Sequence, residues 1–476
     1  MGKLLSMTIL RRQQQLVSCI LLLPLLLSLY QQQQQRQHGM MVGAFRCHSN
    51  NNVYQQPRTA ANKAGRTTAV LNRRVAEDTT ATATIMKMSA SASASSNTNM
   101  NNEESVQLSE RVQRLKKVLR REYITFFAPM QCEYYSEDVT FEDPLTSLAG
   151  VQNYQQNVDM LASRTFLGKF LFQDAGIVLH SVEGGEVSSN DDGVSTISNI
   201  TTRWTLRVTA KVIPWSPTAR FTGISVYKVS QGGSEGVIID HQTDYWDSIN
   251  IQKGGTYDKV DLSLAVQDFL QQLKPQKGKA AAAGVELPYQ LLRRGKDYEL
   301  RRYPAYTTAT IPYDRRDEGY DVLASVTKGI EPMSPSVMVV PNDDSTTKKT
   351  MSWPLVYAAP GEASPSPIPQ VILDRSQTAM FHDCHIDQVE SQVVAVGTYT
   401  DASVAPIVRR ADQQLRAALQ RDGILVPRPT TAKSDSSESS SSTSSVKFAQ
   451  YDAIFSLGTR RGEVWIDLDN EKGHPY

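Results

Sequence analysis

Acidic residues are missing from the first 76 positions of this 476-residue chain, although the whole chain balances 50 lysines and arginines against 49 aspartates and glutamates. The first 102 residues carry 11 basic and 2 acidic side chains, a net charge of +9, which leaves −8 for the remainder. Nucleic-acid binders usually concentrate basic residues on a face of the folded domain. We therefore expect no nucleic-acid partner.

Cysteine is scarce, and Cys132 and Cys384 are the only two of the four that lie outside the N-terminal leader-like segment. They are far apart in the sequence, so no disulfide framework is available, which disfavours an extracellular destination. The nucleophile elbow, the phosphate loop, the dinucleotide fingerprint and paired zinc motifs are also missing. The enzyme classes that depend on those motifs are therefore excluded.

The apolar run at Leu16–Leu29 is short for a bilayer span and is interrupted by Pro24. Because basic residues precede it, residues 1–44 fit a secretory signal peptide better than a membrane helix. Residues 45–102 are basic and rich in Ser, Thr, Ala and Asn, and they resemble a transit peptide. Together the two segments resemble the bipartite presequences of algae with additional plastid membranes. They predict import into the plastid (chloroplast stroma); the secretory pathway and an uncleaved signal anchor are the alternatives.

Residues 103–274 predict one folded domain. Ser105 can cap a helix whose apolar residues recur at helical spacing, and a second helix is expected near 154–161. Strand-like runs and a closing helix follow, at 166–183, 200–212, 219–230, 237–249 and 261–274. Helices followed by an antiparallel meander indicate an α+β fold.

Residues 275–284 are rich in Ala, Gly and Lys and mark a linker before a second domain at 285–476. The strings YELRRYPAY (Tyr298–Tyr306) and RRGEVWIDL (Arg460–Leu468) predict strands near its two ends, the second of them half-buried because its apolar residues alternate. One helix is expected over Tyr320–Ile330, and another from a Ser403 cap to Gly423. The Ser-rich stretch at 430–447 predicts a looped-out insertion.

These two strings resemble the first and last strands of the SOUL heme-binding family. The phrases FEDPLTSLAGVQNY, ITTRWTL, PWSPTARFTGIS and DYWDSIN resemble a domain of unknown function that precedes SOUL domains in plastid proteins and is related to the nuclear-transport-factor-like cone. The resemblance implies an α+β protein with an N-terminal cone-like domain of helices and antiparallel sheet. It implies a C-terminal SOUL-type antiparallel β-barrel with two helices.

The resemblance also implies a groove for heme or another tetrapyrrole on the first helix of the C-terminal domain. The residues transferred by position are Tyr320, Leu323, Ala324 and Thr327, with Lys328 or Arg315 for a propionate. The alternative is that the apolar members are core and the charged ones are solvated surface. The segment TMSWPLVYAAPG at 350–361 departs from the family pattern, so the wall of the groove is expected to differ.

Two histidines in FHDCHID, His382 and His385, are the candidate iron ligands, although a structural or solvent-facing histidine is the commoner case. In a strand they would point to opposite faces and could not easily share one metal. In the N-terminal domain the side chains able to do acid–base work are polar residues near expected strands, with two tryptophans to shape a pocket. They are Tyr135, Asp138, Asp143, His241 and Asp244, with Trp204 and Trp246.

These observations predict a non-enzymatic protein that binds heme or a related tetrapyrrole as a carrier or buffer, with no stable membrane span in the mature chain. A heme-degrading or tetrapyrrole-synthesis enzyme is the expected protein partner. A first alternative makes the N-terminal domain an enzyme or binding module for a small hydrophobic molecule, with the SOUL half as a docking platform. A second alternative is a ligand-free interaction scaffold.

Overall fold

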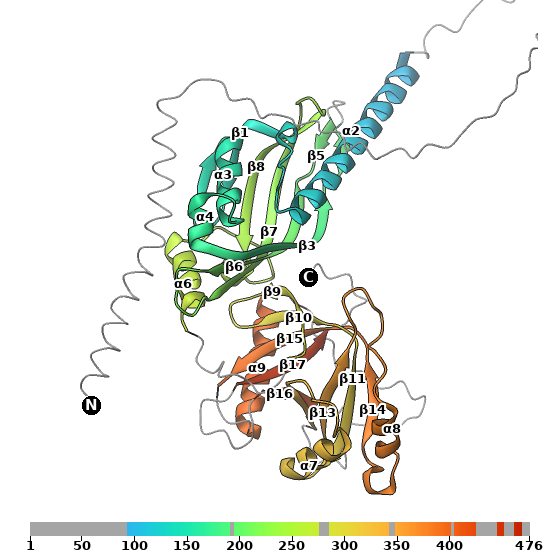
Figure 1. The fold of residues 1–476 in the computed structure, drawn as a ribbon. Helices are drawn as coiled ribbons and strands as arrows, with labels where there is room; N and C mark the ends of the chain where they lie inside the picture. The colour runs from blue at the N-terminus through green and yellow to red at the C-terminus, as the bar shows by residue number, and fades with distance from the viewer. Residues whose placement is uncertain are drawn as a thin grey trace, which may run out of the picture.

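The computed structural model describes residues 93–190, 195–275, 285–341, 348–400, 404–424, 445–451 and 461–468. The predicted signal segment at 1–44, residues 45–92 of the predicted transit segment at 45–102, residues 276–284 of the predicted linker at 275–284 and most of the Ser-rich stretch lie outside these ranges. Within them the chain forms two bodies, each built of helices packed on a sheet (Figure 1). The predicted α+β class is confirmed.

The N-terminal half is built around a six-stranded sheet with the order β2-β1-β8-β7-β6-β3. All neighbouring pairs are antiparallel except β1 and β8, which run parallel. A second, two-stranded ribbon pairs β4 with β5. The elements are α2 (Ser93–Ile124), η1 (Cys132–Tyr134), β1 (Tyr135–Glu142), β2 (Ser147–Ala149), α3 (Val151–Leu161), α4 (Phe166–Leu171), β3 (Phe172–Gly184), β4 (Val187–Ser189), β5 (Ser195–Ile197), β6 (Ile200–Ala210), β7 (Thr218–Gln231), β8 (Val237–Trp246), α5 (Asp247–Asn250) and α6 (Leu262–Leu273).

Helix α2 covers the sheet of this half, as its apolar spacing predicts. Leu108, Val112, Leu115 and Leu119 are each at most 2% exposed and belong to one core cluster with sheet residues such as Ile200. The helix begins at Ser93, so Ser105 lies inside it and not at its start. Serine costs only a few tenths of a kcal/mol in a helix interior, so a residue suited to capping does not by itself end a helix.

Two local predictions for this half differ from the structure. The first part of the run at 166–183 forms the helix α4, because the Thr165 side chain accepts a hydrogen bond from Gly168 N at 3.0 Å and starts a helical turn. Strand β1 was not predicted, although Val139 and Phe141 alternate with Thr140 and Glu142 and are buried. It joins the sheet through pairing with β8, a long-range contact that local sequence does not encode.

The C-terminal half is a nine-stranded antiparallel ladder in the order β14-β11-β13-β12-β16-β17-β15-β10-β9. Its ends in this pairing scheme are β14 and β9. The elements are β9 (Gln290–Arg294), β10 (Glu299–Tyr303), β11 (Tyr306–Tyr313), α7 (Arg316–Val326), β12 (Ser336–Pro341), β13 (Lys349–Tyr357), α8 (Gln370–Ser376), η2 (Ala379–Phe381), β14 (His385–Val389), β15 (Gln392–Tyr399), α9 (Ala405–Arg421), β16 (Ser445–Gln450) and β17 (Gly462–Leu468).

The two expected helices of this half are present as α7 and α9, but α7 begins at Arg316 and ends at Val326, so the expected helical residues Thr327 and Ile330 lie after its end. A short third helix, α8, was not predicted. Gly423 follows the end of α9 with φ +75°, a conformation that glycine adopts without strain. The proposed cap, Ser403, lies outside the described residues. Strand β16 begins at Ser445, so the last residues of the predicted Ser-rich insertion belong to the sheet.

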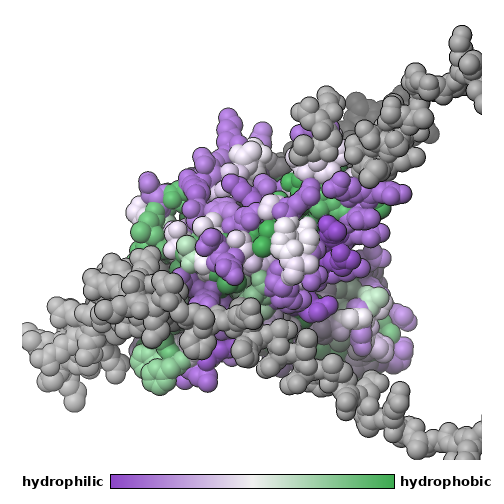
Figure 2. All heavy atoms as spheres, turned by 90° about the horizontal axis from the view of Figure 1, so that it is seen from above, coloured by the Kyte–Doolittle hydropathy of each residue, from purple (hydrophilic) through white to green (hydrophobic). Residues whose placement is uncertain are grey.

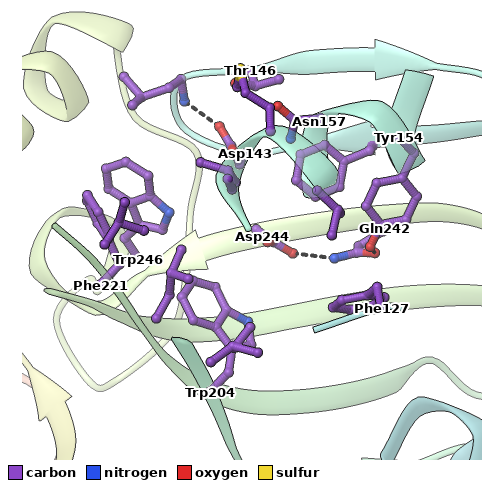
Figure 3. A pocket seen from close by; sticks show the side chains of 18 of the residues that line it. Phe127, Asp143, Thr146, Tyr154, Asn157, Trp204, Phe221, Gln242, Asp244 and Trp246 are labelled. Atoms are coloured by element: carbon purple, nitrogen blue, oxygen red, sulfur yellow. Dashed lines mark hydrogen bonds between the residues drawn. The ribbon is translucent and has the colours of Figure 1, made fainter. Parts of the chain in front are cut away.

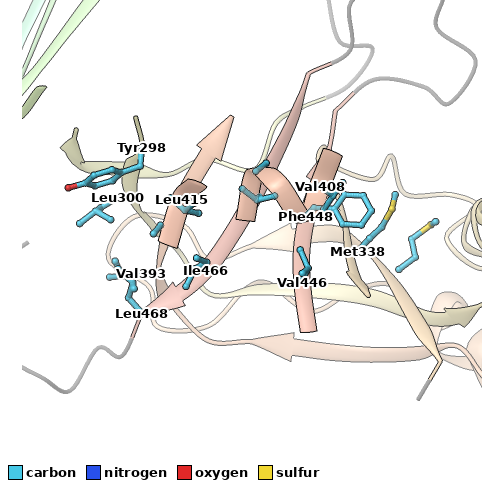
Figure 4. Close-up of a cluster of buried hydrophobic side chains, with 14 of the residues drawn as sticks. Tyr298, Leu300, Met338, Val393, Val408, Leu415, Val446, Phe448, Ile466 and Leu468 are labelled. Atoms are coloured by element: carbon cyan, nitrogen blue, oxygen red, sulfur yellow. The ribbon is translucent and has the colours of Figure 1, made fainter. Parts of the chain in front are cut away.

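The main core of the C-terminal half lies between α9 and the sheet (Figure 4). Val464, Ile466 and Leu468 of β17 face this core, as their alternation predicts. The opposite face of β17 was expected to meet solvent, yet Trp465 is 1% exposed and Glu463 is fully buried. A second cluster that includes Tyr303 and Trp465 covers that face. The strand is therefore buried on both sides apart from Asp467.

The two halves meet along β9. Thr205 Oγ1 of β6 donates a hydrogen bond to the Leu291 carbonyl at 2.8 Å, and Arg294 N donates to Thr222 Oγ1 of β7 at 2.7 Å. The Arg294 guanidinium also forms an ion pair with Asp268 of α6. Because backbone groups of β9 and charged groups of both halves take part in these bonds, the contact has a defined geometry.

The face of the molecule in Figure 2 is mostly hydrophilic, with apolar side chains in small separate patches. In the described part of the chain, no helix is both long enough and apolar enough to cross a membrane. The apolar run at 16–29 lies outside that part.

Candidate functional site

An apolar cavity of about 280 Å³ opens inside the N-terminal half (Figure 3). Its walls come from α2, α3, α6 and the strands β1, β3, β6, β7 and β8, together with the loop that follows β1. Most of the wall is aromatic or aliphatic.

One of the two carboxyl groups in this cavity belongs to Asp143, on the loop after β1. Its Oδ1 accepts a hydrogen bond from Leu145 N at 2.7 Å, so the carboxylate closes the turn that leads into β2. Burial raises the pKa of Asp143 to about 6, although the backbone hydrogen bonds to Leu145 and Thr146 act in the opposite direction. The aspartate therefore has a structural role in the turn and also lines the cavity.

The second carboxyl group belongs to Asp244 on β8. Its Oδ1 accepts from Gln242 Nε2 at 2.8 Å, and Tyr154 OH of α3 donates to Gln242 Oε1 at 2.6 Å. Burial raises the pKa of Asp244 to about 7, and the charge of Asp143 adds to this effect. The two aspartates thus influence each other within one apolar space.

Aromatic rings flank the two aspartates. Trp204, Phe221 and Trp246 gather on one side of them, and Phe127 and Tyr154 lie on the other (Figure 3). The rings of Phe221 and Trp246 are 4.4 Å apart, and Phe141 stacks on Tyr154 at 5.0 Å. Such packing fixes the shape of the cavity, because each ring is held by a neighbour.

Four residues proposed from the sequence therefore line this cavity: Asp143, Trp204, Asp244 and Trp246. The other three do not. Asp138 is exposed on β1, Tyr135 is buried and donates to Glu122 Oε2 at 2.8 Å, and His241 lies between Thr140 and Thr243. Sequence reasoning missed Tyr154, Asn157 and Gln242. The one signal that could have indicated them is a polar residue on the apolar face of an expected helix or strand.

A second cavity, of about 240 Å³, lies in the C-terminal half where α7 and α9 begin. Val340, Val408, Val446 and Phe448 are among its apolar wall residues, and Arg316, Lys349 and Arg409 bring cationic groups to it. The Arg316 guanidinium lies over the Phe448 ring, 5.4 Å from its centroid. Asp314 is the one acidic residue in the wall. The site therefore combines an apolar floor with an excess of positive charge.

The six groove residues expected from the family resemblance all map to α7 or its two ends. Leu323 and Thr327 are at most 2% exposed and belong to the protein core, with Thr327 Oγ1 donating to the Leu323 carbonyl at 2.8 Å. Tyr320 is half-buried and packs on Trp353 at 5.6 Å, while Ala324 is exposed. None of the six lines either cavity described above.

The two candidate cations of that groove lie beyond opposite ends of α7. Arg315 precedes the helix and pairs with Asp317, and Lys328 is exposed just after the helix ends. Thirteen positions of helical rise separate them by roughly 20 Å. The family resemblance implies one or the other of them as the propionate partner, and this assignment stays a prediction.

Both candidate iron ligands are exposed. His382 follows the short helix η2 and pairs with the neighbouring Asp383, with 3.1 Å between Nε2 and Oδ1. His385 is the first residue of β14. Within the described ranges, no group of three or more His, Cys, Asp or Glu residues could hold a metal ion. Either histidine could still act as a single axial ligand, so their assignment stays a prediction.

Two regions of the chain match known families. Residues 113–241 match the family described as uncharacterized conserved protein DUF2358, and residues 285–467 match the family described as SOUL heme-binding protein. No curated protein matches the chain.

Several solved structures resemble part of the chain. A putative polyketide cyclase from Xanthomonas campestris is 13% identical, with 35% of this chain and 98% of that chain covered and a TM-score of 0.22. An NTF2-like superfamily protein from Salmonella enterica is 12% identical, over 29% and 92%, with a TM-score of 0.22. A hydrolase from Listeria innocua is 6% identical, over 36% and 92%, with a TM-score of 0.26.

The two matched regions coincide with the two folded halves: the DUF2358 match lies within the N-terminal body, and the SOUL match extends from the chain before β9 to β17. The chain therefore joins a DUF2358 region to a region of the SOUL heme-binding family.

Proposed function

We propose that the C-terminal half binds heme or a related tetrapyrrole without transforming it, and that the protein acts as a carrier or buffer in the plastid. The observation that carries this proposal is the match of residues 285–467 to a family described as heme-binding. The absence of the common catalytic motifs from the sequence supports a binding role over an enzymatic one.

The second cavity supports this proposal through the chemistry of its wall. A tetrapyrrole with two propionates needs apolar contact for the ring and cations for the carboxylates. Val446 and Phe448 supply apolar surface, and Arg316, Lys349 and Arg409 supply positive charge around it. A volume of about 240 Å³ suits one edge of a macrocycle, so the remainder of the ring would stay outside the cavity.

The chain's own residues would have two tasks in this arrangement. Lys349 and Arg409 are exposed, where their side chains can reach a propionate, whereas Arg316 is half-buried and held over Phe448. Asp314 would repel a carboxylate, so the propionates are expected to lie on the side of Lys349 and Arg409. When heme is bound, its iron supplies redox chemistry, and a carrier role requires the protein to keep that iron from reacting.

The experiment is a titration of hemin and protoporphyrin IX into purified protein, followed by absorption and tryptophan quenching. We expect saturable one-to-one binding, weakened about 10-fold or more by Lys349→Glu combined with Arg409→Glu. The matched controls are Arg315→Glu and Lys328→Glu, which test the face of α7 expected from the family resemblance. If only the control variants weaken binding, the ring lies on α7; if no hemin titration saturates, the proposal is wrong.

The histidines are tested in the same assay. If His382 or His385 ligates the iron, its replacement by alanine changes the spectrum of the hemin complex and leaves protoporphyrin IX binding unchanged. Equal effects on both compounds would instead indicate a role in contacting the ring.

The plastid location is part of the proposal and rests on residues 1–102, of which residues 1–92 lie outside the described ranges. A fluorescent reporter fused after residue 102 should enter the plastid of an alga with a bipartite import route. Delivery of the reporter to the secretory pathway would contradict this. The proposed partner, a heme-degrading or tetrapyrrole-synthesis enzyme, should then be captured from plastid extract with the hemin-loaded protein and less with the hemin-free protein.

A further inference from the structure

We propose that the cavity in the N-terminal half binds a small, largely apolar molecule that carries one basic amine. None of its lining residues belongs to the second cavity, so this site is independent of the tetrapyrrole proposal for the C-terminal half.

The argument begins with charge. The wall of the cavity contains two carboxyl groups, Asp143 and Asp244, and no lysine, arginine or histidine. A carboxylate in an apolar space is costly unless a cation accompanies it. Elsewhere in this half the protein supplies such a cation, since Arg203 pairs with the buried Asp247 at 2.8 Å. In the cavity the wall supplies none, and a cationic ligand would provide the missing charge.

The hydrogen bonds already present leave room for a ligand. Asp244 accepts from Gln242 and Ser225, and Asp143 accepts from Leu145 N and from the backbone and side chain of Thr146. A carboxylate can accept about four hydrogen bonds, so each aspartate keeps capacity for an ammonium group. Tyr154 does not compete for Asp244, because its hydroxyl donates to Gln242 Oε1.

The aromatic walls favour the same class of ligand. The negative faces of aromatic rings attract cations, tryptophan most strongly, and the attraction grows when water is excluded. Trp204, Phe221 and Trp246 surround one side of the aspartates (Figure 3). The same rings accommodate an apolar body. At about 280 Å³ the cavity suits a molecule with one ring and a short chain, below the size of a typical drug.

The response to pH separates an amine from a neutral ligand. The pKa values of Asp143 and Asp244, raised by burial to about 6 and about 7, make both groups ionise between about pH 5 and pH 8. An amine should therefore bind more tightly as pH rises through this range. A ligand that only accepts hydrogen bonds should bind less tightly, because it needs the protonated acids.

Other titratable groups near the aspartates do not reverse this expectation. Burial raises the pKa values of Tyr123, Tyr154 and Tyr227 further above neutrality, so these phenols stay neutral. Glu122 of α2 is the remaining acid that titrates in the same range, with a pKa raised by burial to about 7. It does not line the cavity and bonds instead to Gln131 N and Tyr135 OH.

The test uses three probes of similar shape and different charge: phenylbutylamine, phenylbutanol and phenylbutanoate. Each is titrated into the full chain by calorimetry and tryptophan fluorescence, near pH 8 and near pH 5. Near pH 8 we expect the amine to bind about 10-fold more tightly than the alcohol, and the carboxylate to bind least. The amine should lose most of this preference near pH 5.

The variants are Asp143→Asn and Asp244→Asn, singly and together, with the exposed Asp138→Asn as the matched control. The double variant should lower amine affinity about 10-fold, or about 1.4 kcal/mol. It should leave alcohol binding intact, which also shows that the cavity is still folded. Hemin binding by the same variants should not change.

Four results would overturn the proposal. They are an amine that does not saturate, an alcohol that binds as tightly as the amine, an amine affinity unchanged in the double variant, and an amine affinity that rises as pH falls. If hemin still bound in any of these cases, the tetrapyrrole proposal would stand alone.

Discussion

Arg301 and Glu463 form a buried ion pair across the sheet of the C-terminal half. Arg301 Nη1 donates to both carboxylate oxygens of Glu463, at 3.1 and 3.0 Å, and the side chains are 4% and 0% exposed. Their strands, β10 and β17, lie on either side of β15. The pair therefore joins the two strings that first indicated the fold, YELRRYPAY and RRGEVWIDL.

Removing the charge of Arg301 should destabilise the C-terminal half. The variant Arg301→Met leaves Glu463 buried with only part of its partners, and we expect a loss of about 3–5 kcal/mol. Arg302→Met is the control, because Arg302 lies on the same strand and is exposed. Urea unfolding monitored by tryptophan fluorescence measures both. Equal unfolding free energies for the two variants would show that the pair contributes little.

The stability of the N-terminal half should fall as pH rises through neutrality. Burial raises the pKa of Glu122 to about 7 from a usual value of 4.5, so the folded state binds the proton more tightly. This contribution is complete below about pH 4.5 and is lost as pH rises through about 7. Glu122→Gln should remove up to about 3 kcal/mol of pH dependence. Urea unfolding at several pH values tests this, with the exposed Glu137→Gln expected to retain the wild-type profile.

Removing the charge of Asp247 should lower the stability of both halves, because its two arginine partners come from different halves. It accepts from Arg203 Nη2 of β6 at 2.8 Å, and Arg293 of β9 approaches within 4.0 Å. Burial alone would raise its pKa, yet the two guanidinium groups hold the pKa of Asp247 below its usual value, so its contribution is lost only in acid. At neutral pH Asp247→Asn leaves two buried cations and should cost about 3–5 kcal/mol.

The measurement for Asp247→Asn is again chemical denaturation, with Asp240→Asn as a control on β8, where the side chain is exposed. A change of less than about 1 kcal/mol would indicate that the arginines find other partners.

Core packing beneath α2 gives a fourth prediction. Leu115 is fully buried, whereas Val106 on the same helix is 60% exposed. Leu115→Ala should cost about 2–5 kcal/mol through lost burial and the cavity left behind. Val106→Ala should change stability by less than about 0.5 kcal/mol. Similar effects of the two substitutions on the thermal midpoint would mean that α2 does not pack as described.

Much of the fold could be predicted because its signals are periodic. The stripe from Leu108 to Leu119 predicts α2, and alternation predicts which residues of β17 face the main core. Strand β1 was missed although Val139 and Phe141 alternate with polar residues, and its parallel pairing with β8 is a long-range contact that local sequence does not encode. Helix α4 was missed since a capping interaction of Thr165 prevails over a short apolar run.

The two candidate sites differ in how many of their residues could be predicted from the sequence. Asp143, Asp244, Trp204 and Trp246 were among the seven residues proposed for acid–base work or for shaping a pocket, and these four line one cavity. Tyr154 and Gln242 could not be added, since α3 and β8 meet only in the folded chain. The cavity with Arg316, Lys349 and Arg409 likewise could not be predicted from the sequence, because its cations come from three separate elements, α7, β13 and α9.

The sequence by itself determined the two-part order of the chain, the helices with strong periodicity and the two families to which its regions are similar. Local propensity and short sequence motifs suffice for these, because each signal lies within a short stretch of the chain. Only the tertiary structure decided that Glu463 is buried against Arg301 and that Asp143 and Asp244 share one cavity. Burial and charge pairing depend on which distant segments fold together, and the free energy of a buried carboxylate depends on those neighbours.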